Sequence, residues 1–246
     1  MKKIISITIL SLLVIGCGKK DEEKKYTKFY EDGTVVYFNP VTGKKCDSTE
    51  SVSTTGTKEG CMKWYSFLDS EGSEKVNLIL DHNTTATTKW TNQSHDKNPD
   101  VVTAQLYKDV ENWDEDVKET ARLITAEEVN KIAPMVPGYT WDKDDITKYY
   151  SLHTGSQTKH GSYAEPVEAG TNRFAWLFEN TYECTNFGCN EADNITYGYW
   201  TSTAPANSIG RAWRVSCDGS LATFDTVSEE YEGVRPVITI SKSLIK

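Results

Sequence analysis

Three closely spaced segments near the C-terminus decide the fold: GYWTSTA at residues 198–204, RAWRVSCDGSL at 211–221 and EGVRPVITIS at 232–241. Aromatic and β-branched residues are frequent in all three, as is typical of strands. The strands that we expect here cover residues 197–203, 211–217 and 234–240. The C-terminal part of the chain is therefore predicted to be a set of β-hairpins.

The middle of these strands shows which side faces the core. Side chains alternate between the two faces of a strand, which places Trp213, Val215 and Cys217 on one face and Arg214 and Ser216 on the other. Tryptophan and valine mark the inner face, so we expect Trp213 in the core. Cys217 on the same face is then predicted to be a buried free thiol.

The chain upstream begins with strands and continues with helices. Strand patterns cover residues 34–38, 62–68 and 75–80. Apolar residues at positions 102, 106, 110 and 113 then recur at helical spacing after Asn98-Pro99-Asp100. A capping box at Thr125 predicts a second, short helix, which Pro134 and Pro137 end.

A long segment of low order separates these helices from the C-terminal strands. Residues 138–172 have little periodicity, and loops of this length inside a domain are usually functional or disordered. A strand pattern returns at 174–178. Strands, two helices, a long loop region and antiparallel hairpins together predict an α+β fold.

The N-terminus indicates export. Residues 1–16 combine Lys2 and Lys3 with an apolar run that is too short to span a bilayer, and Val14-Ile15-Gly16 lead to Cys17. This resembles the lipobox of bacterial lipoproteins, in which the signal peptide is cleaved before the cysteine and that cysteine is acylated. Residues 17–25 would then be the lipidated cysteine and a charged tether. The chain is expected at the bacterial cell membrane, lipid-anchored and facing outward.

Charge and composition limit the classes of binding partner that the chain can have. The 246 residues carry a formal net charge of −9. This argues against a nucleic acid as the partner, because its phosphates are bound by a positively charged protein surface. No histidine spacing indicates a metal site, and we expect no cofactor. The expected partners are the membrane, through the lipid, and a carbohydrate or protein ligand.

Export also makes disulfides the default state of the cysteines. Besides Cys17 there are five, and five thiols allow two bridges and one free thiol in many ways. The simplest choice pairs neighbours, Cys46 with Cys61 across a Ser/Thr/Gly-rich loop and Cys184 with Cys189 across a tight turn. Cys217 is then left over.

The quoted C-terminal segments also resemble the closing strands of bacterial C-type-lectin-like domains, a superfamily that includes the formylglycine-generating enzymes. The resemblance is clearest over 174–242 and implies a domain at 75–246, preceded by an N-terminal β-hairpin region at 26–74. It implies loops that bind ligands on a rigid scaffold. Formylglycine generation needs a pair of late, substrate-facing cysteines, and here only Cys217 lies late.

The calcium motif of the sugar-binding members is also incomplete. Glu165-Pro166-Val167 and Trp200-Thr201-Ser202 stand where that motif has further oxygen ligands, so calcium is not supported. Asp142-Lys143-Asp144-Asp145 lacks a turn glycine and a closing glutamate, which favours a solvated loop. Asp81-His82 follows a strand, where a turn is the simpler interpretation than a general base.

Aromatic and arginine side chains beside a loop are the usual anchors of a binding surface. They form the predicted ligand site together with the loop at 204–210: Tyr199, Trp200, Asn207, Arg211 and Arg214. Trp200 serves equally well as a core residue, and Arg235 is expected to brace its strand. The sequence thus predicts non-catalytic recognition, including adhesion. The alternatives are a formylglycine-generating-like enzyme and a structural component of the cell envelope.

Overall fold

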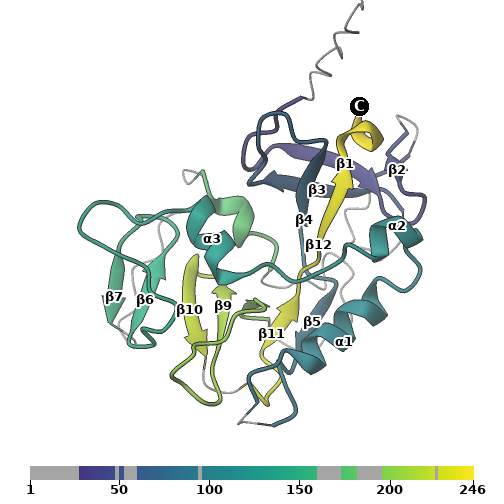
Figure 1. Ribbon diagram of the computed structural model, residues 1–246. Helices are drawn as coiled ribbons and strands as arrows, with labels where there is room; N and C mark the ends of the chain where they lie inside the picture. The colour runs from purple at the N-terminus through teal and green to yellow at the C-terminus, as the bar shows by residue number, and fades with distance from the viewer. Residues whose placement is uncertain are drawn as a thin grey trace, which may run out of the picture.

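Two β-sheets and three short α-helices make up the described part of the chain (Figure 1). The computed structural model describes residues 28–47, 50–52, 60–93, 96–159, 173–181, 196–224 and 227–246. The α+β class is confirmed. The leader, Cys17, the tether, Cys184 and Cys189 lie outside the described residues.

The first sheet has five strands in the order β12-β4-β3-β1-β2, and every neighbouring pair is antiparallel. Its strands are β1 (Val35–Asn39), β2 (Lys44–Lys45), β3 (Met62–Phe67), β4 (Lys75–Leu80) and β12 (Val237–Ser241). The sheet therefore takes strands from both sides of the boundary expected at residue 74. The disulfide Cys46–Cys61 beside β2 and β3 is confirmed.

The second sheet has seven strands in the order β5-β11-β8-β9-β10-β6-β7, with one parallel pair, β11 beside β8. Its strands are β5 (Thr85–Thr88), β6 (Lys148–Ser151), β7 (Gln157–Lys159), β8 (Gly198–Trp200), β9 (Ala212–Ser216), β10 (Ser220–Phe224) and β11 (Glu232–Val234). Because β6 and β7 lie within residues 138–172, part of that expected loop is sheet.

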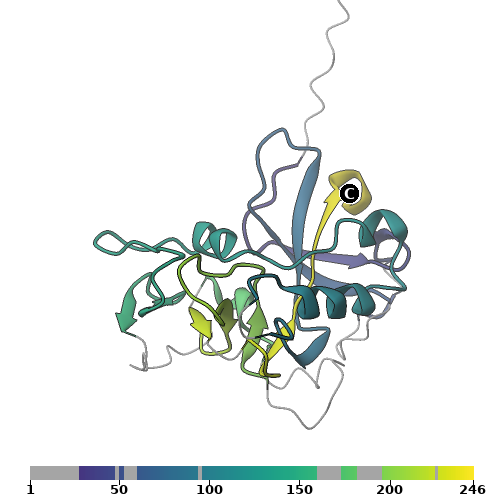
Figure 2. The same cartoon turned by 60° about the horizontal axis from the view of Figure 1, so that its bottom comes forward.

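The helices connect the early strands to the late ones. α1 (Asp100–Asp109) buries Val102 and Leu106, as their spacing predicts. α2 (Glu115–Lys118) is a single turn that the sequence analysis did not identify. α3 (Ala126–Ile132) begins with the predicted capping box, since Thr125 accepts from the Glu128 amide and the Glu128 side chain accepts from the Thr125 amide. Figure 2 shows the segment between α2 and α3 crossing β12, with α1 and α3 on opposite sides of the crossing.

The two faces of the five-stranded sheet contribute to different core clusters, although Val35, Tyr37 and β2 at its edge are exposed. Trp64 and Leu78 pack with α1 in the first cluster. Their strand neighbours Tyr65 and Ile79 point the other way and pack with α3 in the second. The second sheet contributes to both, because Trp200 belongs to the first cluster and Tyr199, Trp213 and Val215 to the second. Alternation along a strand thus builds two cores.

The chain passes from the second sheet to the first at Arg235-Pro236, between β11 and β12. Arg235 is fully buried and donates four hydrogen bonds to main-chain carbonyls. Its Nε bonds to Leu80 O at 2.6 Å, and its two terminal nitrogens bond to the carbonyls of Leu177 at 2.7 Å, Asp81 at 2.9 Å and Trp176 at 2.8 Å. Arg235 therefore braces the end of β4 and η1.

This brace explains two corrections to the predicted strands. The predicted strand at 174–178 is wrong, because residues 175–177 form a short 3₁₀-helix, η1 (Ala175–Leu177), whose carbonyls face Arg235. The predicted strand at 234–240 is divided between β11 and β12 by the arginine and proline. In both places a tertiary contact overrides a local β pattern.

Within the described ranges, none of the helices has the length and apolar character needed to cross a membrane.

Replacing Arg235 by lysine should destabilise the domain severely. Lysine keeps the charge but lacks the planar fork of donors, so several buried carbonyls lose their partners at about 1–3 kcal/mol each. We expect Arg235→Lys to lower the free energy of unfolding by about 3 kcal/mol or more in urea denaturation. Arg173→Lys, at an exposed position, is the control and should change it by less than about 0.5 kcal/mol. Equal stability of the two variants would contradict this role.

Candidate functional site

Tyr199 and Trp200, two of the predicted ligand contacts, are core residues. Both side chains are fully buried. The Tyr199 hydroxyl donates to Leu177 O at 2.7 Å, and the Trp200 indole donates to Thr88 O at 2.8 Å. Burial raises the pKa of Tyr199 to about 12, and the neighbouring Arg235 opposes this shift. Their prediction as surface anchors is wrong, because packing covers both faces of β8.

Arg214 is also engaged within the protein. Its guanidinium forms an ion pair with Glu232 and lies 4.4 Å from the centre of the Phe224 ring. The arginine side chain is 13% exposed and that of Glu232 is fully buried. Arg214 does lie on the opposite face of β9 from Trp213, as predicted, but this face is covered. We therefore assign Arg214 a structural role in place of the predicted ligand contact.

Burial sets the protonation of Glu232. Removal from water raises the pKa of its carboxyl group to about 7, while the attraction of Arg214 lowers it and the nearby charge of Asp218 raises it. The desolvation of the charged carboxylate is the largest of these influences. Near neutral pH this buried carboxyl group therefore exchanges between its two protonation states.

Asn207 and Arg211 occupy the surface loop 204–210 and its end. Asn207 is exposed and Arg211 is half-buried. Asp144 holds the loop by accepting from the Ala206 amide at 2.5 Å, a contact that is the main reason why the pKa of this carboxyl is lowered. The acidic segment 142–145 thus anchors the predicted binding loop. Within the described ranges, no group of three or more His, Cys, Asp or Glu residues is placed to hold a metal ion.

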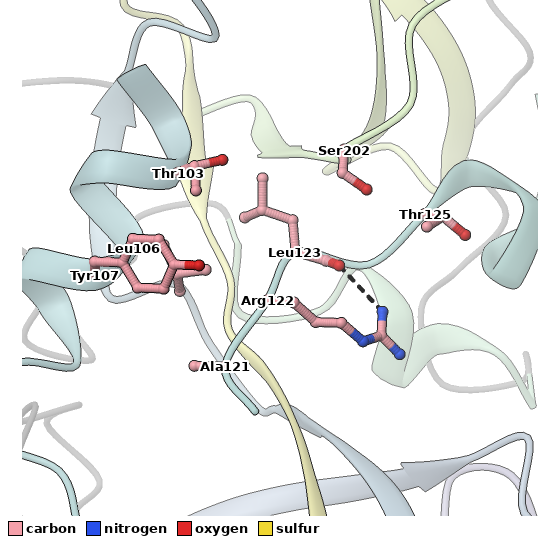
Figure 3. Close-up of a pocket in the computed structure, with 8 residues that line it drawn as sticks. All are labelled: Thr103, Leu106, Tyr107, Ala121, Arg122, Leu123, Thr125 and Ser202. Atoms are coloured by element: carbon pink, nitrogen blue, oxygen red, sulfur yellow. Dashed lines mark hydrogen bonds between the residues drawn. The ribbon is translucent and has the colours of Figure 1, made fainter. Parts of the chain in front are cut away.

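A pocket lies between α1 and the segment that joins α2 to α3 (Figure 3). Its volume is about 180 Å³. It is lined by Thr103, Leu106, Tyr107, Ala121, Arg122, Leu123, Thr125 and Ser202. Among these, only Ser202 belongs to the C-terminal stretch GYWTSTA. None of the lining residues is among the predicted ligand contacts, because contacts between distant segments create the hollow.

The lining combines apolar and hydroxyl groups. Leu106, Ala121 and Leu123 are buried, and Figure 3 shows the Leu123 side chain between Thr103 and Ser202. The hydroxyl groups of Thr103 and Ser202 donate no hydrogen bond within the described part of the chain. They remain available to a ligand.

The arginine at this pocket is neutralised by a neighbour. Arg122 donates two hydrogen bonds to the carboxylate of Glu128, at 2.8 and 2.7 Å, and one to Leu123 O at 3.1 Å. Burial raises the pKa of Glu128. The hydrogen bonds from Arg122 and Thr125 together lower the pKa by more than burial raises it, so the net shift is downward. The pair therefore stays ionised with its charges matched, so the pocket presents a neutral lining.

Cys217 is a free thiol, as predicted, but it is half-buried instead of fully buried. Burial raises its pKa, the charges of Asp218 and Glu232 add to this rise, and Arg214 opposes it. A raised pKa reduces the thiolate fraction and with it the nucleophilicity of the sulfur.

Removing the titrating carboxyl of Glu232 should change how stability depends on pH. Its folded pKa lies above the ordinary value of 4.5, so its stabilising contribution is present below about pH 4.5 and is lost as the pH rises through 7. The quantity to follow is the free energy of unfolding of the wild type minus that of Glu232→Gln. This difference should fall by roughly 3 kcal/mol between pH 4.5 and pH 7.5. The exposed Glu111→Gln serves as control, and a constant difference across this range would contradict the assignment.

No protein-family model, curated protein or solved structure matches this chain. The interpretation of the pocket therefore rests on its own residues, an apolar floor bordered by free hydroxyl groups and an exposed tyrosine.

Proposed function

We propose that this chain is an exported, lipid-anchored protein that recognises a carbohydrate or protein ligand without catalysis, and that the pocket between α1 and Ser202 receives part of that ligand. The observation that carries the proposal is the neutral, hydroxyl-bordered lining of this pocket. Ligand sites are typically mostly apolar hollows with a few polar groups that orient the ligand.

The size of the pocket indicates how much of the ligand enters. Its volume of about 180 Å³ is smaller than the roughly 300–1,000 Å³ of sites that enclose drug-sized molecules. One sugar ring or one amino-acid side chain is the appropriate occupant. Tyr107 is 55% exposed at the edge of the pocket and offers an aromatic surface beside the occupant.

The surface loop 204–210 extends the proposed site. It follows Ser202 closely in the sequence, and we infer that a longer ligand contacts Asn207 and Arg211 as well. Of the predicted contacts, Asn207 is exposed and Arg211 is half-buried. The loop is fastened by Asp144, which limits the entropy that binding must remove.

The arrangement of the strands supports a C-type-lectin-like fold as the finer proposal. The last strand, β12, pairs along its full length with the early strand β4. Helices follow β4, and the antiparallel strands β8, β9 and β10 come late. Export and lipidation rest on Lys2, Lys3 and the lipobox at Cys17.

A formylglycine-generating-like enzyme is the competing proposal, and its test is the reactivity of Cys217. A catalytic cysteine requires a lowered thiol pKa, whereas burial raises the pKa of this one. Iodoacetamide at pH 8 should therefore label native Cys217 much more slowly than the unfolded chain, as measured by mass spectrometry of the peptide that contains it. Labelling of the native protein at the rate of the unfolded chain would favour the enzyme.

Filling the pocket should abolish binding. The wild type is first screened against glycans, peptidoglycan and matrix proteins to find a ligand that it binds saturably. Thr103→Trp places an indole in the pocket and should no longer bind that ligand. Thr154→Trp, at an exposed position away from the pocket, should bind as the wild type does. Similar thermal unfolding of both variants would show that Thr103→Trp retains its fold. Undiminished binding by a folded Thr103→Trp variant would place the ligand elsewhere.

A further inference from the structure

A cluster of polar side chains lies at the end of β4, away from the pocket. Asp81 follows β4 directly, and its amide donates to Lys63 O at 3.0 Å, so Lys63 and Asp81 are neighbours on adjacent strands. Asn180 comes from a distant part of the chain, three residues after η1. The proposed ligand site uses none of these three residues.

The carboxylate of Asp81 bridges the other two side chains. Lys63 Nζ lies 3.2 Å from Asp81 Oδ1, and the Asn180 amide donates to Asp81 Oδ2 at 2.9 Å. An amine and a carboxamide are thus held against the two oxygens of one carboxylate. Attack on the amide carbon of Asn180 requires the lysine nitrogen to come to roughly 3–3.5 Å, a movement for which the long flexible stem of lysine is suited.

Arg235 fixes the main chain on both sides of this cluster. It donates to the carbonyl of Asp81 and to those of Trp176 and Leu177, shortly before Asn180. Asn180 itself has a left-handed backbone with φ of 60°, a conformation that asparagine adopts more readily than most residues. The carboxylate and the carboxamide are therefore positioned by rigid, buried contacts.

The surroundings exclude much of the water. The Asp81 side chain is 8% exposed and that of Lys63 is 33% exposed. The amine lies 4.8 Å from the centre of the Tyr65 ring, which packs against Trp176. The amine and the carboxylate are therefore partly shielded from water.

We propose that Lys63 and Asn180 form an intramolecular isopeptide bond, with Asp81 transferring the proton. Asp81 accepts a proton from the ammonium group, and the neutral Nζ attacks Cγ of Asn180. The new bond joins Nζ to Cγ, the bond from Cγ to Nδ2 breaks, and the nitrogen of Asn180 departs as ammonia with the protons supplied through Asp81. The step requires no oxidant and no other reactant, and the product is an amide that ties β3 to the segment after η1.

The protonation of Lys63 determines the rate. Burial lowers its pKa, but hydrogen bonds and charges from Tyr65 and Asp81 raise it, and the net shift is upward. The other ionisable groups of the cluster are His82, whose pKa burial lowers to about 4, and the permanently charged Arg235. The amine is thus mostly protonated at neutral pH, so the bond should form slowly and faster as the pH rises.

Mass spectrometry of the full chain tests the proposal directly. The reduced chain should weigh less than its sequence by the mass of one ammonia after incubation at pH 8. Trypsin should not cleave after Lys63, and the peptide with Lys63 should be joined to the peptide with Asn180. Full-length wild type in which these two peptides remain separate after prolonged incubation would overturn the proposal.

Matched variants separate this chemistry from an ordinary ion pair. Lys63→Arg and Asp81→Asn should both retain the ammonia and leave the peptides separate, because one lacks a nucleophile and the other the proton acceptor. Lys75→Arg and Asp116→Asn change the same residue types at exposed positions and should form the bond as the wild type does. Loss of ammonia in Lys63→Arg would identify ring closure of an asparagine to a succinimide elsewhere. If the wild type also lacked the cross-linked peptides, this result would refute the bond.

Discussion

The buried guanidinium of Arg235 is the constraint on which the rest of the structure depends. It stands at the point where the chain leaves one sheet and enters the other, and it satisfies four carbonyls from the end of β4 and from η1. Charged groups are rarely buried unless every donor finds an acceptor, and here the acceptors are main-chain atoms that cannot be replaced by a change of side chain. One side chain thereby determines where β4 ends, where η1 lies and how the two sheets meet.

The pocket follows from the same crossing of the two sheets. The segment before α3 passes over β12, where Arg122 and Val237 exchange main-chain hydrogen bonds of 2.9 and 2.8 Å. That contact holds the segment away from α1, and Leu123 and Ser202 border the space that remains. The bidentate bonds to Glu128 fix Arg122 at the same time. A neutral hollow on a rigid frame suits recognition, because little order has to be created when a ligand binds.

The sequence predicted those elements whose pattern is local, and missed those that depend on distant contacts. β4 and the capped start of α3 were identified because alternation and capping act over a few residues. The single turn of α2 and the polar strand β5, with the sequence TATT, carry too little periodicity. For the candidate site, alternation correctly separated the two faces of β9, but it does not tell whether a second layer covers the polar face. Alternation therefore predicts Tyr199 and Arg214 as surface contacts and leaves Trp200 open between surface and core. The pocket depends on contacts between segments far apart in the sequence.

Two of the buried carboxyl groups, Asp81 and Glu232, show how the partner of an acid determines its chemistry. Glu232 faces the guanidinium of Arg214, which remains protonated under all conditions that a protein encounters and cannot act as a nucleophile. The pair is therefore structural, and only the protonation state of Glu232 changes with pH. Asp81 faces the amine of Lys63, which can lose its proton, and it also holds a carboxamide that can be attacked. Burial and ion pairing are common to both sites. The reactivity that we infer at Asp81 therefore arises because its partner is a lysine, where Glu232 has an arginine, and because Asn180 lies nearby.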